Sequence, residues 1–183
     1  MFGSISKARL RWKIPLSIFH LFEGRAEQAL MSMTQAHELA PGIPSIDFFY
    51  ALILMYNGSL EEAFSIVEES KKTNPDNVFT QVGIFLKYAL QGKKKEALQS
   101  ATPQVLEWSC NDFTNPLGIV AGYSLIGEKE EALNWFEKWI DLGFINYPFL
   151  SKYNTFLENI RGEERFKKLM ERVKHEWENF ELL

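Results

Sequence analysis

Cysteine is nearly absent from this chain, since its 183 residues include only Cys110. A single cysteine excludes a framework of internal disulfides and favours a reducing compartment. The basic start and the apolar stretch IPLSIFHLF resemble an export signal, but the stretch is short and no small-residue cleavage site follows it. We therefore expect a cytoplasmic protein.

Long apolar runs and a large net charge are also missing. The longest strictly apolar run, from Phe48 to Met55, is far shorter than a membrane-spanning helix requires. The formal net charge of −4 gives no general attraction to nucleic acid. Only the start is locally basic, and we interpret its charges as a solvated helix face: Lys7, Arg9, Arg11 and Lys13. The sequence thus predicts no nucleic-acid partner and no membrane span.

Few residues have the types and spacing that catalysis or metal binding needs. The three histidines, His20, His37 and His175, do not form a spaced pair suited to a metal, and none is near Cys110 in sequence. Each Gly-x4-Ala string lacks the preceding strand of a phosphate-binding loop. We therefore expect a protein that is not an enzyme and that uses no cofactor and no metal.

The chain does contain a glycine that returns at steps of 34, 34 and 35 residues, followed each time by an alanine five positions later. These residues are Gly24, Gly58, Gly92 and Gly127, with Ala29, Ala63, Ala97 and Ala132. A fixed period of this length is typical of helix–turn–helix repeats. We expect each glycine to close one helix in a left-handed turn and each alanine to pack tightly in the next helix.

With these strings, and with Pro41 and Pro75 twelve residues after the first two alanines, the chain resembles the tetratricopeptide repeat family. The resemblance covers repeats at about 10–43, 44–77, 78–112 and 113–146. It implies an all-α fold in one domain over residues 1–183, a right-handed superhelix of antiparallel helix pairs. The second repeat matches best, and the family's tryptophan near the start of each unit is missing throughout.

The two helices of each predicted unit differ in character. The second helices, at about 61–72 and 128–141, are amphipathic and begin with acidic residues. The first helix at about 48–56 is apolar on every side, that at 78–90 carries only Lys87 as a charge, and that at 113–126 carries none. Such helices are expected to be buried on all sides. Internal glycines, at positions 83, 118 and 122, indicate close helix approach, and prolines at positions 15 and 116 predict first turns.

The family resemblance also implies which positions line the concave groove of the array. They are Ile14, Ile18, Leu21, Phe48, Leu52, Met55, Tyr56, Phe79, Val82, Leu86, Leu117 and Ala121. The lysines and asparagines with which such arrays grip chaperone C-termini are absent from these positions. An apolar groove suits an amphipathic helix or a hydrophobic strand. We expect it to be self-closed, filled by the N-terminal segment, or covered by a partner or a second copy.

The period ends after Phe144, and residues 147–183 predict two capping helices, at about 148–160 and 163–180. Phe156, Ile160, Arg161, Arg165 and Phe166 are similar to the tail that closes many bacterial tetratricopeptide arrays, although Asn154 and Thr155 replace its Asp-Pro. A terminal repeat needs a cap with a polar outer face. The expected inner stripe of the last helix is Phe166, Leu169, Val173 and Trp177.

Three functions fit this sequence. The favoured one is a non-catalytic protein–protein interaction module that binds a partner segment, or a second copy, in the apolar groove. The tail resemblance also fits the regulatory C-terminal portion of a larger bacterial signalling or transcription protein. The apolar first helices permit a carrier of an apolar small molecule, but no convergent polar group marks a site for a headgroup.

Overall fold

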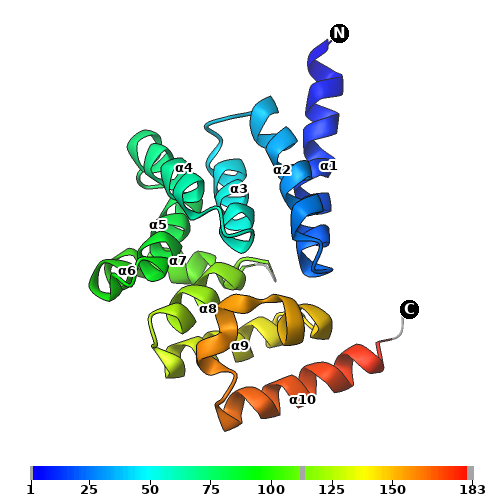
Figure 1. The fold of residues 1–183 in the computed structure, drawn as a ribbon, viewed down its shortest axis with the longest axis vertical. Coiled ribbons are helices and arrows are strands. Elements are labelled where there is room, and N and C mark those ends of the chain that lie inside the picture. The colour runs from blue at the N-terminus through cyan, green and yellow to red at the C-terminus, as the bar shows by residue number, and fades with distance from the viewer. Residues whose placement is uncertain (1, 112–113, 181–183) are drawn as a thin grey trace. The chain divides into compact units, whose positions relative to one another are not determined.

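The computed structural model describes residues 2–111 and 114–180, with side chains from Trp12 onward, and every regular element in these ranges is a helix (Figure 1). The predicted all-α class is confirmed. The α-helices are α1 Phe2–Phe22, α2 Ala26–Leu39, α3 Pro44–Tyr56, α4 Leu60–Thr73, α5 Val78–Leu90, α6 Lys94–Ser100, α7 Pro103–Trp108, α8 Pro116–Leu125, α9 Lys129–Asp141 and α10 Glu164–Glu178. A π-helix, η1 Phe149–Tyr153, and a 3₁₀-helix, η2 Thr155–Ile160, precede α10.

The chain divides into two compact units, Met1–Ile84 and Phe85–Leu183, and the division falls inside α5. In the first unit α2 packs against both α1 and α3, and α3 packs against α4. In the second unit α8 packs against α9, and both helices contact η2. Neighbours in sequence are therefore neighbours in space, as helix–turn–helix repeats require. The predicted boundary between the third and fourth repeats, at residues 112 and 113, lies outside the described residues.

The repeated glycines and alanines have the roles that their spacing predicts. Gly24, Gly58, Gly92 and Gly127 have φ angles of 73°, 78°, 69° and 75°, in the left-handed region that only glycine adopts without strain. The four alanines, Ala29, Ala63, Ala97 and Ala132, are completely buried. Each turn thus reverses the chain within a few residues, and each alanine lets the following helix approach its neighbours closely.

The first helices are buried on nearly all sides, as predicted. In α8 every residue from Pro116 to Ser124 is buried, and Pro116 lies in the first turn. Gly122 shows why a glycine is needed there, because an added Cβ would lie 2.2 Å from Cε1 of Phe85. The Phe85 ring instead packs edge-on against Tyr123, with 5.3 Å between the ring centroids. Close helix approach at Gly122 is therefore confirmed.

The expectation for Pro15 is wrong, and Pro103 divides one of the second helices. Pro15 does not lie in a first turn, because α1 begins at Phe2 and carries this proline in its interior. The second helix of the third unit is broken into α6 and α7. The break comes at Pro103, which begins α7, and the Thr102 hydroxyl caps the new helix by accepting a hydrogen bond from Val105 N–H at 3.4 Å.

The C-terminal segment caps α9, although its first helix is not the continuous one predicted for residues 148–160. Asn154 separates η1 from η2, with φ −84° and ψ 88°, and its side chain accepts a hydrogen bond from Phe156 N–H at 3.2 Å. Arg161 secures this break by donating to the carbonyl oxygens of Leu150 and Asn154, each at 2.9 Å. A short Asx turn therefore interrupts the helix where its sequence pattern is otherwise apolar.

The last helix, α10, packs on α9 through the predicted stripe, with one exception. The Phe166 ring stacks on Phe136 with 4.9 Å between the centroids, and Leu169 and Val173 are buried. Trp177 was expected in the same stripe but is 44% exposed, because it lies at the end of the helix beyond this contact. Ion pairs flank the stripe, including Lys129–Glu163 at 2.6 Å and Arg172–Asp141 at 2.7 Å.

Candidate interaction surfaces

The structure buries most of the residues predicted to line the groove. Nine of the twelve positions are buried: Ile18, Leu21, Phe48, Leu52, Met55, Val82, Leu86, Leu117 and Ala121. Ile14, Tyr56 and Phe79 are the partly exposed positions. The nine buried side chains already pack against other parts of the chain, so they offer a partner little accessible apolar area.

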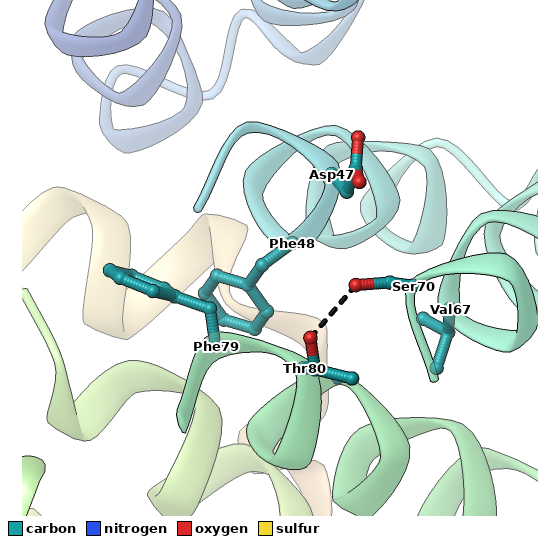
Figure 2. Close-up of a pocket in the computed structure, with 7 residues that line it drawn as sticks. Asp47, Phe48, Val67, Ser70, Phe79 and Thr80 are labelled. Carbon is teal, nitrogen blue, oxygen red and sulfur yellow. Dashed lines mark hydrogen bonds between the residues drawn. The ribbon is translucent and has the colours of Figure 1, made fainter. Parts of the chain in front are cut away.

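Within the first unit, two of these positions line a small, partly enclosed cavity between α3, α4 and α5. The cavity has a volume of about 10 Å³ and is lined by Asp47, Phe48, Val67, Ser70, Phe79, Thr80 and Gly83. Figure 2 shows the rings of Phe48 and Phe79 side by side at its edge, with 5.9 Å between their centroids. Such a space holds about one water molecule. It is too small for an apolar ligand of the kind that a carrier would bind.

The polar groups around this cavity already have partners. The Ser70 and Thr80 hydroxyls share a hydrogen bond of 2.8 Å that ties α4 to α5, and the Asp47 carboxylate points away from them (Figure 2). Asp47 Oδ1 lies 3.2 Å from His37 Nε2 and accepts from Gly42 N–H at 3.3 Å. The carboxylate thereby holds the turn between α2 and α3 against the start of α3.

Burial raises the pKa of Asp47 above its ordinary value, and the Gly42 and His37 contacts lower it by less. Its neighbour Tyr50 stacks on His37, with 4.6 Å between the centroids, and donates a 2.7 Å hydrogen bond to Glu62 Oε1. Burial, followed by the bond to Glu62, raises the pKa of the Tyr50 phenol. These groups link α2, α3 and α4 through polar side chains inside a largely apolar unit.

This arrangement ties the helices together, since each carboxylate, hydroxyl and imidazole named above contacts another group of the same cluster. Within residues 2–111 and 114–180, no group of three or more His, Cys, Asp or Glu side chains is placed to hold a metal ion. The helices in that part of the chain are also too short or too polar to cross a membrane.

Among the described side chains, the exposed large apolar residues are concentrated on the hairpin of α1 and α2. Trp12, Lys13, Leu16, Gln35, Glu38 and Leu39 line an open depression of about 570 Å³ there, and we call these six residues the hairpin face. By helical spacing the same sides of the two helices continue to Phe19 on α1 and Met31 on α2. The exposed fractions are 72% for Trp12, 44% for Leu16, 53% for Phe19, 65% for Met31 and 48% for Leu39.

The hairpin face is not among the predicted site residues, because the groove positions predicted on α1 lie on the opposite side of that helix. Ile14, Ile18 and Leu21 repeat at helical spacing, and so do Trp12, Leu16 and Phe19, displaced from the first set. Both stripes were visible in the sequence, but only the first matched the groove register of the repeat family. The side chains of Lys7, Arg9 and Arg11, which were interpreted as a solvated face, lie outside the described side chains.

The turns, the buried alanines and the helix packing define an all-helical protein built from helix hairpins. No protein-family model matches the chain, and no curated protein sequence matches it.

Among solved structures, the chain is similar to MamA 41-end from Desulfovibrio magneticus RS-1. The two are 14% identical with a TM-score of 0.45, over 91% of this chain and 96% of that one. For the MamA RS-1 ArsTM double mutant the identity is 14% and the TM-score 0.46, over 94% and 98% of the two chains. For MamA from AMB-1 the values are 17% and 0.46, over 90% and 98%.

Proposed function

We propose that this chain is a protein–protein interaction module and that the hairpin face is its docking surface. The observation that carries this proposal is the concentration of exposed apolar side chains on one hairpin. Of the ten large apolar side chains exposed within the described part of the chain, six fall between residues 12 and 43: Trp12, Leu16, Phe19, Met31, Leu39 and Ile43. Contiguous apolar patches on a protein surface commonly mark interaction sites.

The chemistry of the hairpin face supports binding of a protein helix. Trp12 supplies the kind of large aromatic anchor that dominates interface energies. Lys13, Gln35 and Glu38 supply a polar rim, with Lys13 already donating a hydrogen bond to Gln35. A shallow depression between two helices fits an amphipathic helix laid along it. Binding at the groove is a second proposal, supported by the partial exposure of Ile14, Tyr56 and Phe79.

Site-specific photo-crosslinking in cells tests the proposed surface. A photoreactive amino acid at Gln35, in the middle of the hairpin face, should give discrete protein adducts that are identified by mass spectrometry. The same amino acid at Lys95, an exposed position on α6, is the matched control. Adding Trp12→Glu should abolish the Gln35 adducts. If Gln35 gives no adduct, or if its adducts survive Trp12→Glu, the hairpin face is not the docking surface.

A further inference from the structure

We infer that the occupant of the hairpin face is the hairpin face of a second copy of this chain. This inference rests on the proposed function, and it specifies the partner. Isologous dimers pair the same surface of both subunits, so the surface must be complementary to itself. The hairpin face is complementary to itself in three respects: its apolar area, the heights at which its residues lie along the two helices, and its charge.

The exposed area is of the size that a dimer of this kind needs. From the exposed fractions of Trp12, Leu16, Phe19, Met31 and Leu39, and typical side-chain areas, the patch exposes on the order of 600 Å². Monomeric proteins rarely leave larger patches open. A standard stable interface buries about 800 Å² on each partner. The flanking side chains of Lys13, Gln35 and Glu38 supply the remainder as a polar rim.

The levels of the residues on α1 and α2 allow a two-fold arrangement. Lys13 donates to Gln35, so these residues lie level with one another along the antiparallel hairpin. Trp12 and Leu39 line the same depression one step further along. We place a two-fold axis between the two copies, parallel to the helices and centred over the depression. Rotation about this axis lays α1 of each copy on α2 of the other. Trp12 then meets Leu39 of the second copy, and four helices enclose the apolar side chains.

The charges on the hairpin face match in the same arrangement. Each copy presents Lys13 from α1 and Glu38 from α2, and both residues line the depression. The two-fold places Lys13 of each copy against Glu38 of the other, which forms two symmetric ion pairs. Opposite charges that meet in this way fix the register of an interface and disfavour other partners. Lys13 and Glu38 cancel in net charge, so the residues that line the hollow offer no net attraction to an anionic membrane surface.

Reciprocal charge reversal tests this pairing. We expect the parent chain to show about twice its 21.2 kDa mass in light scattering. Lys13→Glu and Glu38→Lys should each weaken self-association by about tenfold or more, because like charges then meet twice in every dimer. An equimolar mixture of the two variants should dimerise again, because each variant carries the charge that the other needs. The variant with both reversals should also dimerise.

Circular dichroism melts of each variant verify folding, and Lys95→Glu is the control charge reversal, which should leave the dimer intact. The inference is overturned if the parent is monomeric, if the single variants dimerise like the parent, or if their mixture does not recover. In each case a Gln35 crosslink to a different protein would leave the proposed function standing. Trp12-dependent sedimentation with phosphatidylserine vesicles, together with a monomeric parent, would assign the surface to membranes and overturn both proposals.

Discussion

Asp47 is a carboxylate inside α3, a helix that is otherwise apolar on nearly every side. Its burial raises its pKa, so the ionised form is the less favourable one in the folded state. When the pKa of a group is higher in the folded state than in the unfolded state, the group contributes most to stability at a pH below its pKa in the unfolded state. That contribution is lost as the pH rises through its pKa in the folded state. The charge on Asp47 therefore costs stability at neutral pH.

We expect Asp47→Asn to melt at a temperature equal to or above that of the parent at neutral pH. The asparagine oxygen can still accept from Gly42 N–H, and the cost of a buried charge is removed. The difference between variant and parent should shrink as the pH is lowered through the folded pKa of Asp47, because the parent then becomes neutral as well. Thermal melts across this pH series measure the sign of the difference in melting temperature between variant and parent. A variant that is much less stable at neutral pH would show that the His37 contact outweighs desolvation.

At the scale of elements, α10 covers the apolar side of α9 with the stripe from Phe166 to Val173, and Trp177 lies beyond it. We expect Phe166→Ala to lower the free energy of unfolding by about 3–5 kcal/mol, because the ring that stacks on Phe136 is removed and leaves a cavity. Trp177→Ala, on the same helix but beyond the contact, should change stability by about 0.5 kcal/mol or less. Denaturant unfolding measures the change in the free energy of unfolding for both variants. Equal effects would mean that the end of α10 at Trp177 contributes as much as the contact at Phe166.

Elements were predictable from sequence where a local rule sets them. The glycine turns follow from backbone freedom, and α5, whose largely apolar sequence carries only Lys87 as a charge, begins and ends as predicted at Val78 and Leu90. The breaks were harder to foresee. Asn154 interrupts an apolar helical pattern because its side chain accepts a hydrogen bond from Phe156 N–H, and Arg161 stabilises that break through contacts seven and eleven residues away. Such choices depend on tertiary partners, which periodicity does not reveal.

At the scale of the whole molecule, the candidate site was less predictable than the fold. The repeat register identified apolar positions on the first helices correctly, but register alone cannot distinguish a groove from a core. Leu52 and Leu86 are 1% and 0% exposed, so they contribute to the cores of the first and second compact units. The hairpin face was not identified because a single sequence does not show which of two apolar stripes on α1 is covered by the rest of the chain.

This distinction between groove and core gives the last prediction. Leu52→Asp and Leu86→Asp each place an unpaired charge in a packed apolar interior, so we expect each to lower the free energy of unfolding by about 4 kcal/mol or more. Leu98→Asp, at a position that is 40% exposed, is the matched control and should remain folded. Circular dichroism melts distinguish these outcomes. Should the Leu52 or Leu86 variant fold normally and lose only its partner, that leucine lines an accessible groove, and the docking surface extends beyond the hairpin face.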